Sequence, residues 1–264
     1  LKKGHYKTDK LNVSSFKFYA DGALGSRGAL LVETYSDIIE QEHFGLLVNT
    51  MDTLKKYAPL LYKKEFQMNT HCIGDGANQQ VLSIYANTLK TTNDKRWRIE
   101  HAQVIAPEDF EKFKNYNIIP SVQPTHATSD MYWANNRLGE ERVKNAYAYK
   151  RLLKQNGLIA LGTDFPVEGI NPLSTFYAAT VRKDNKGFPK KGYQMENALT
   201  KEEALKGMTI WAAISNFEEN EKGSIEVGKV ADFVILNQDI MTIEEGMIPK
   251  TKATATYISG EKVY

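Results

Sequence analysis

Apolar residues recur along the chain with two alternating periods, one typical of a strand and one typical of a helix. Residues 14–20 (SSFKFYA) alternate between polar and apolar side chains, whereas residues 51–65 carry apolar side chains at helical spacing. The predicted strands cover residues 14–20, 67–72, 98–102, 118–122 and 158–163. The predicted helices cover residues 51–65, 75–89, 107–115 and 140–155, a segment that opens near Pro172, and residues 201–215.

This order of elements predicts an α/β fold in which helical crossovers connect parallel strands. A complete (β/α)8 barrel takes about 250 residues and eight strands. An open doubly wound sheet can stop at five strands, so the number of strands does not decide between the two. After residue 222 the pattern changes to short β-branched stretches joined by Gly-containing turns. We therefore predict an α/β domain over residues 1–222 and a small β-rich domain over residues 223–264.

Composition and charge exclude several classes of protein. Hydrophobic residues make up 42% of the chain and charged residues 25%, which is ordinary for a globular protein. The net charge of +2 gives no reason to expect a nucleic acid or an anionic membrane as partner. A single cysteine, Cys72, excludes an internal disulfide and a Cys-rich zinc site. No segment resembles a membrane span or a signal peptide, and the cytoplasm is the expected location.

Polar side chains gather where the predicted strands end. His71 ends the second strand, His101 ends the third, His126 follows the fourth and Asp164 ends the fifth, while Lys17 lies inside the first. The carboxyl ends of parallel strands meet at one edge of a sheet, which is where α/β proteins build their sites. Neutral imidazole and carboxylate groups suit Zn²⁺ and related divalent ions. The pattern therefore predicts a metal site at this edge.

Each of these residues also has a simpler structural explanation. A histidine at a strand end is more often a hydrogen-bonded loop residue than a ligand, Asp164 can cap a turn, and Lys17 can face solvent from an edge strand. Independent structural roles rarely place all of them at one edge, which favours a shared site. A nucleotide-binding doubly wound protein is disfavoured, because no phosphate-binding loop follows any predicted strand.

Six segments in the same order along the chain carry a more specific signal. They resemble the YtcJ-like branch of the amidohydrolase superfamily, amidohydrolase family 3. The segments are KFYADGALGSRGALL, THCIGDGANQQVL, RWRIEHAQVI, IIPSVQPTHATSDMYWANNRLGEER, GLIALGTDFPVEGINP and GSIEVGKVADFVILNQD. The resemblance implies strands 4 to 8 of a (β/α)8 barrel, followed by a β-rich domain to which both chain ends contribute. It also implies one or two divalent metals, zinc above all, and hydrolysis of an amide or another non-peptide carbon–nitrogen bond in a small molecule.

The resemblance also implies a role for each residue at the strand ends. His71 and His101 correspond to the metal ligands on barrel strands 5 and 6. Asp164 corresponds to the strand 8 aspartate, which contacts metal and acts as the general base toward the attacking water. Lys17 stands where binuclear members carry a carboxylated lysine that bridges two metals, and His126 matches a histidine that contacts substrate.

The Gly-rich loop DGALGSRG contributes two further candidates. Asp21 and Arg27 are predicted to line the pocket and contact substrate. The glycines of this loop fit neither the dinucleotide fingerprint nor the phosphate-binding P-loop. Tight turning of the backbone is the better explanation of these glycines.

One motif of the superfamily is missing from the sequence. No two of the histidines, His5, His43, His71, His101 and His126, are separated by a single residue, so the His-x-His of barrel strand 1 is absent. We therefore expect a C-terminal fragment with open sheet edges and an apolar interior without its other wall. Two hypotheses follow. Either the chain is a metallohydrolase completed by its N-terminal half or by self-association, or it is a catalytically incomplete half-barrel that acts only as an assembly or binding partner.

Overall fold

A parallel sheet of strand order β3-β4-β5-β6 forms the centre of the first of two compact units. The structure, a computed structural model, describes residues 3–264. The first unit comprises Leu1–Val122 and Asp130–Leu158, and the second comprises Gln123–Ser129 and Ile159–Tyr264. The four strands are β3 (Ser15–Tyr19), β4 (Gln67–Cys72), β5 (Arg98–His101) and β6 (Ile119–Val122). These positions agree with the predicted strands, and the parallel pairing confirms the predicted α/β fold.

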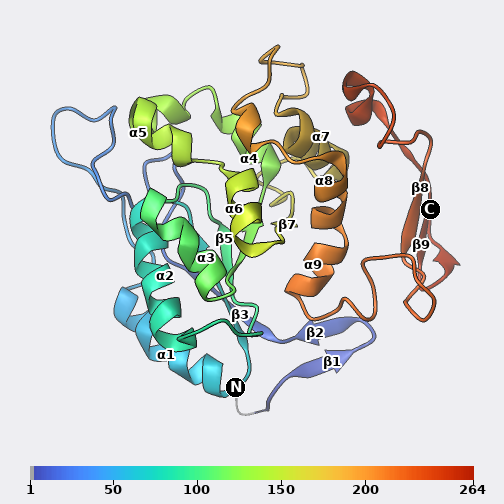
Figure 1. Cartoon of the computed structure of the whole chain (residues 1–264), viewed down its shortest axis with the longest axis horizontal. Helices are drawn as coiled ribbons and strands as arrows, with labels where there is room; N and C mark the ends of the chain where they lie inside the picture. The colour runs from blue at the N-terminus through green and yellow to red at the C-terminus, as the bar shows by residue number, and fades with distance from the viewer. Residues whose placement is uncertain (1–2) are drawn as a thin grey trace. The chain divides into compact units, whose positions relative to one another are not determined.

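Helices of the first unit pack on one face of this sheet, in front of the strands in Figure 1. They are α1 (Met51–Lys63), α2 (Asp75–Leu89), η1 (Pro107–Asp109) with α3 (Phe110–Asn115), and α6 (Tyr149–Asn156). Thr50 begins α1, because its side chain accepts a hydrogen bond from the Thr53 backbone N–H. The apolar stripe of α2 includes Val81 and Leu82, and both side chains are fully buried in the first unit.

The two faces of the sheet differ in chemistry. The strand register aligns Lys17 with Asn69 and Arg98, and Tyr19 with His71 and Glu100. Because side chains alternate along a strand, these polar groups share one face. The opposite face carries the apolar side chains Phe16, Phe18, Met68 and Ile99, which pack toward the helices. The face that carries Lys17, His71 and Glu100 is polar and charged, so the expectation of an apolar interior is wrong for that face.

The helix predicted over residues 140–155 is broken into three pieces. They are α5 (Ala134–Arg142), η2 (Val143–Asn145) and α6. Tyr147 interrupts the helical path with a φ of 54°, and its backbone N–H donates to Gln103 O at 2.7 Å instead of to the preceding turn. The pattern also did not predict three short elements. They are the antiparallel strands β1 (Tyr6–Thr8) and β2 (Leu11–Val13) and the helix α4 (Pro124–Asp130).

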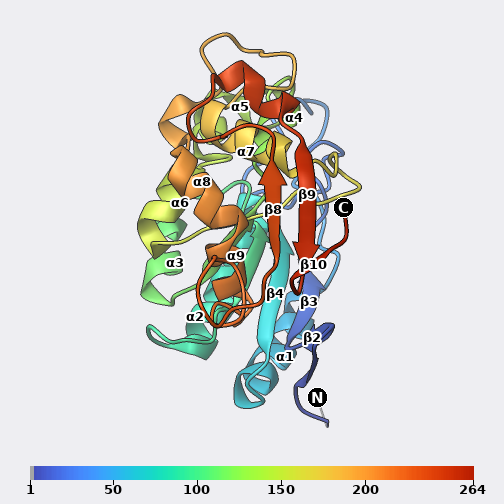
Figure 2. The ribbon, with the colours of Figure 1, turned by 90° about the vertical axis from the view of Figure 1, so that its right-hand side faces the viewer.

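The second unit contains the remaining helices and an antiparallel sheet. Besides most of α4, it comprises in chain order β7 (Ala160–Leu161), α7 (Pro172–Val181), η3 (Met195–Asn197), α8 (Lys201–Met208), α9 (Ile210–Ser215), β8 (Phe233–Leu236), η4 (Glu245–Lys250), β9 (Ala253–Ile258) and β10 (Glu261–Lys262). The sheet has the order β10-β9-β8, visible in Figure 2, which confirms the predicted antiparallel β-rich segment. The strand predicted over residues 158–163 has only two residues, and the helix predicted over residues 201–215 breaks at Thr209.

The predicted domain boundary after residue 222 lies inside the second unit. The Val230 backbone N–H donates to Glu221 O at 2.8 Å, and Gly223 packs closely on α9, where an added Cβ would lie 2.8 Å from the Cβ of Ala213. The segment that follows residue 222 is therefore held to α9.

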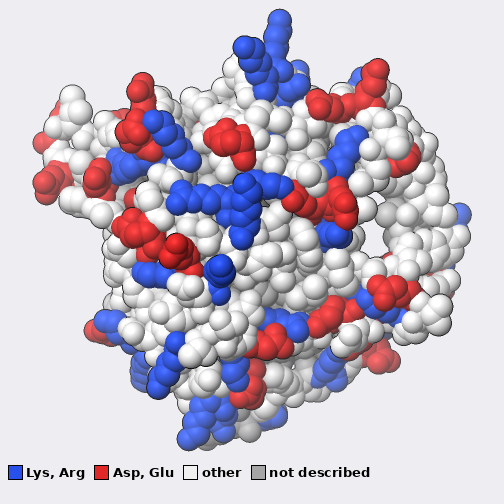
Figure 3. Space-filling model, viewed as in Figure 1, with Lys and Arg blue, Asp and Glu red and all other residues white. Residues whose placement is uncertain are grey.

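None of the helices over residues 3–264 combines the length and apolar character needed to cross a bilayer. Acidic and basic side chains are intermixed on the face shown in Figure 3.

Candidate metal-binding and hydrolytic site

Two of the predicted metal ligands lie side by side at the ends of β4 and β5. The ring centroids of His71 and His101 are 4.5 Å apart, with an angle of 70° between the rings. The register pairs Cys72 with His101, so regular alternation would turn His101 toward the helices together with Cys72. Instead, φ is 76° at His101 and 43° at Ala102, in the left-handed region that few non-glycine residues adopt. The strand thus ends at His101, whose ring lies against His71.

Asp21 lies next to His71. Its side chain is fully buried, and the carboxylate accepts hydrogen bonds from the backbone N–H groups of Leu30, Ile73 and Gly74 at 2.8–3.0 Å. One carboxylate oxygen lies 3.5 Å from His71 Nε2. Burial raises the pKa of Asp21 to about 7, although the backbone hydrogen bonds act in the opposite direction. The substrate contact predicted for Asp21 stays a prediction.

Lys17 lies on the same sheet face as His71. Two charged residues that the sequence did not indicate, Arg98 and Glu100, share this face. Its Nζ is 4.5 Å from the centroid of the Tyr19 ring. Arg98 Nε donates to Glu100 at 2.8 Å. Burial raises the pKa of Glu100, but Arg98, with Ser121 and Lys17, outweighs burial and holds that pKa below its usual value. The sequence held a signal for this group, because Arg98 and Glu100 stand at alternate positions of a strand that was expected to be buried.

The other two predicted site residues at strand ends come together in the second unit. His126 lies in α4 and Asp164 follows β7, and His126 Nε2 is 3.9 Å from Asp164 Oδ2. Asp164, like His101, has a left-handed backbone, with a φ of 57°. Nearby, Ser129 Oγ donates to the Glu168 carboxylate at 2.6 Å, which joins α4 to the loop that carries Asp164. Sequence reasoning did not select Ser129 or Glu168.

Arg27 is bound within the first unit by a carboxylate that the sequence did not indicate. Its Nε and one terminal nitrogen each donate to Asp37 at 3.0 Å, and Arg137 also donates to Asp37. Burial raises the pKa of Asp37, but the two guanidinium groups outweigh burial and lower that pKa below its usual value. These contacts fasten the loop around residue 37 to α5. The substrate contact predicted for Arg27 stays a prediction.

The donor set suits a divalent metal in chemistry, although it is divided between the two units. His71 and His101 provide imidazole nitrogen in the first unit, and Asp164 provides carboxylate oxygen in the second. These are the ligand types that zinc and related ions accept. Across residues 3–264, no three His, Cys, Asp or Glu side chains form a group spaced to hold a metal ion. The structure thus shows a histidine pair and a His–Asp pair, each by itself.

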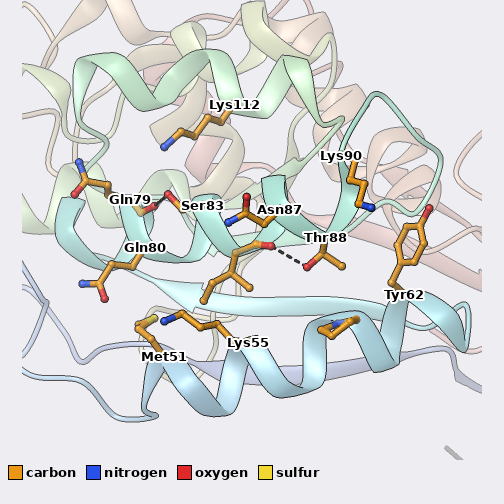
Figure 4. A pocket seen from close by; sticks show the side chains of 12 residues that line it. Met51, Lys55, Tyr62, Gln79, Gln80, Ser83, Asn87, Thr88, Lys90 and Lys112 are labelled. Carbon is orange, nitrogen blue, oxygen red and sulfur yellow. Dashed lines mark hydrogen bonds between the residues drawn. The ribbon is translucent and has the colours of Figure 1, made fainter.

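A cavity of about 850 Å³ lies elsewhere in the first unit, between α1 and α2. Figure 4 shows its lining, which includes Lys55 from α1, Gln80 and Asn87 from α2, and Lys112 from α3. The lining contains no imidazole and no carboxylate. Because these are the groups that bind divalent metals and transfer protons in hydrolysis, we do not place the chemistry there.

The fold places the chain in the class of α/β proteins that carry polar site residues at the carboxyl ends of parallel strands. Within this class, the chain belongs to the amidohydrolase family, whose family model matches residues 1–264. This match confirms the resemblance seen in the sequence. The predicted closure into a (β/α)8 barrel stays an expectation for the whole protein.

Individual relatives agree with this assignment. The chain is 35% identical over 271 residues to protein LONG AFTER FAR-RED 3 of Arabidopsis thaliana, covering 100% of this chain and 45% of the relative. It is 33% identical over 250 residues to YtcJ of Bacillus subtilis (strain 168), covering 95% and 47%. An uncharacterized metal-dependent hydrolase from Pyrococcus horikoshii OT3 has a similar structure, with a TM-score of 0.80 and 32% identity over 92% of this chain and 48% of that chain. The chain spans about half the length of the curated relatives it matches.

Proposed function

We propose that the chain is part of a metal-dependent hydrolase that cleaves a non-peptide carbon–nitrogen bond in a small, amide-like substrate. The observation that carries this proposal is the pair of imidazole rings of His71 and His101, 4.5 Å apart at the ends of neighbouring parallel strands. Membership of the amidohydrolase family supports the type of bond. The relation to a metal-dependent hydrolase supports the need for a divalent ion.

His71, His101 and Asp164 are the residues that would hold this ion, and zinc suits them best. Lys17 would join them as a carboxylated lysine if the whole protein binds two metals. The backbone strain at His101 and Asp164 supports a functional role, because strained residues gather at functional sites and persist only where the surroundings enforce them. When bound, a divalent metal polarises a carbonyl group and lowers the pKa of a coordinated water.

The side chains of the second unit supply the proton transfer. Asp164 accepts a proton from the attacking water and later delivers it to the leaving amine. His126, whose Nε2 is 3.9 Å from Asp164 Oδ2, would donate a hydrogen bond to the substrate carbonyl oxygen. The hydrogen bond between Ser129 and Glu168 holds the loop of Asp164 against α4, which limits the positions that this carboxylate can take.

We further propose that the active form contains the N-terminal half of the same protein, or a second copy that takes its place. A direct test is to purify the chain alone and together with that N-terminal half. Zinc content and turnover of a panel of N-acylated amines would be measured for both. We expect turnover from the completed protein and its loss on His71→Ala. A folded, metal-loaded complete protein that leaves every carbon–nitrogen bond of the panel intact would contradict the proposal and favour the catalytically incomplete assembly partner.

A further inference from the structure

The Asp21 carboxylate joins three segments of the first unit that lie far apart in sequence. One oxygen accepts from the Ile73 N–H at 3.0 Å, and the other accepts from the N–H groups of Leu30 at 2.9 Å and Gly74 at 2.8 Å. Asp21 thereby connects the end of β3, the following loop and the turn after β4. That turn begins directly after Cys72, the residue next to His71. Any movement of Asp21 would therefore act on the end of β4.

The loop and the turn after β4 are in close backbone contact around these hydrogen bonds. A Cβ added to Gly74 would lie 1.9 Å from Leu30 O, and one added to Gly76 would lie 2.9 Å from the carbonyl carbon of Leu31. Both distances are shorter than a van der Waals contact, so the loop and the turn already touch through their backbones. Both oxygens of Asp21 are consequently fixed relative to the end of β4.

His71 presents one nitrogen to this fixed carboxylate. Its Nε2 lies 3.5 Å from Asp21 Oδ1 and 3.5 Å from Gly22 O, and both are hydrogen-bond acceptors. Two acceptors around one ring nitrogen favour the tautomer that carries the proton there. We infer that Asp21 is a positioning residue for His71, which together with Gly22 O keeps the imidazole proton on Nε2 and leaves Nδ1 with its lone pair. In this role Asp21 acts through His71.

Asp75 offers a matched control in the same region. It is also a buried carboxylate, and it accepts hydrogen bonds from the backbone N–H groups of Val32 and Gly76, each at 2.9 Å. It ties the same loop to α2, so its loss would also loosen the first unit. The described hydrogen bonds of Asp75 go to backbone N–H groups and not to an imidazole. A comparison of Asp21→Asn with Asp75→Asn therefore separates the orientation of His71 from general stability.

The test measures the tautomer of His71 in the metal-free 264-residue chain by two-bond ¹H–¹⁵N NMR correlations. A pH of about 8 keeps an ordinary imidazole neutral, since its pKa is about 6.5. His71→Gln identifies the His71 signals. Zinc affinity is measured in parallel by competition with a chromogenic chelator. In Asp21→Asn the amide must direct its NH₂ group at one of the backbone donors, so we expect the His71 ring to lose its fixed proton position.

We expect His71 to carry its proton on Nε2 in the unchanged chain. In Asp21→Asn we expect a mixture of tautomers and a loss of zinc affinity of about ten- to hundredfold. Asp75→Asn should retain the tautomer and affinity within about threefold. A proton on Nδ1 in the unchanged chain would overturn the inference even if Asp21→Asn did not fold. So would unaltered His71 signals and zinc affinity in a folded Asp21→Asn variant.

This inference rests on the proposed function only in treating His71 as a metal ligand. The two fail in different ways, because the tautomer is read without metal or substrate. A proton on Nε2, together with no zinc binding by the chain completed with its N-terminal half, would contradict the proposed function and leave the positioning of His71 by Asp21 intact.

Discussion

The imidazole of His101 reaches that of His71 only because the backbone of β5 turns into the left-handed region at its last residue. The two ring centroids are 4.5 Å apart, and φ at His101 is 76°. A regular strand would direct His101 to the face of its register partner Cys72, which is fully buried. The pairing of the two histidines is thus a local departure from strand geometry. Departures of this kind are typical of functional sites.

Removal of either histidine of this pair should lower the metal content of the chain. His71→Ala and His101→Ala each take away one imidazole donor, so we expect each to reduce bound zinc, and the double variant to bind almost none. Elemental analysis after dialysis against zinc gives the measurement. His5→Ala is the control, because His5 packs against the Phe66 ring, 4.4 Å away, and should leave zinc binding unchanged. Full metal content in the double variant would refute the ligand assignment.

Asp164→Asn should abolish most of the turnover of the completed protein without unfolding it. An amide cannot accept the proton of the attacking water, and general base catalysis contributes about 10²–10⁴-fold to rate. We expect kcat to fall by a factor in that range. Asp239→Asn, which changes a carboxylate that binds the Met241 backbone N–H, should retain normal kcat. Near-normal kcat for Asp164→Asn, with unchanged circular dichroism, would exclude Asp164 as the base.

The sequence pattern predicted those elements whose stability depends on their own periodicity. The predicted ranges 67–72 and 75–89 agree with β4 and α2 at both ends, because apolar residues alternate in the first range and recur at helical spacing in the second. His71 and His101 were found for the same reason, since a strand end can be read from the pattern. The side-by-side arrangement of the two rings goes beyond this pattern, because it depends on the backbone angle at His101.

Long-range contacts explain what the pattern did not predict. Tyr147 breaks a helical stretch because its N–H binds Gln103 O, which lies 44 residues earlier in the chain. The sequence places Asp21 in a Gly-rich loop, and partners at residues 30 and 73 bury its carboxylate. Periodicity carries no information on such contacts, so the burial of Asp21 and the break at Tyr147 required the structure.

Gly74→Ala should destabilise the first unit strongly. The added Cβ would lie 1.9 Å from Leu30 O, and the backbone on both sides would have to separate. We expect a loss of about 3 kcal/mol or more in the free energy of unfolding, at the upper end of overpacking effects. Gly246→Ala is the matched substitution, because an added Cβ there meets no atom within 4 Å. Urea denaturation would measure both, and equal stability of the two variants would contradict the close contact of Gly74 with Leu30.

The Asp37 carboxylate should make the first unit sensitive to acid. Its pKa is lowered in the folded chain, because hydrogen bonds from Arg27 and Arg137 outweigh burial. Because the pKa of Asp37 is lower in the folded chain, its carboxylate stabilises the fold at any pH above the ordinary pKa of 3.8. This stabilisation is lost as the pH falls through the lower pKa of the folded chain. We expect Asp37→Asn to cost roughly 1–2 kcal/mol at neutral pH, between the values for exposed ion pairs and for hydrogen bonds to charged groups. The cost should shrink as the pH falls below 3.8, and a cost independent of pH in urea titrations would argue against the ion pairs.

Exposed apolar side chains after α9 should cause the isolated chain to associate. Ile225 and Val227 are 90% and 108% exposed, and Val234 of β8 is 51% exposed, so three large apolar side chains of the second unit are open to solvent. We expect the unchanged chain to elute from a size-exclusion column as a species larger than 29.9 kDa at micromolar concentration. The double change Ile225→Lys and Val227→Lys should shift elution toward the monomer. Ile39→Lys is the control, since Ile39 is 93% exposed in a loop of the first unit. A monomeric unchanged chain would contradict this prediction, and dissociation by Ile39→Lys alone would move the contact surface to the first unit.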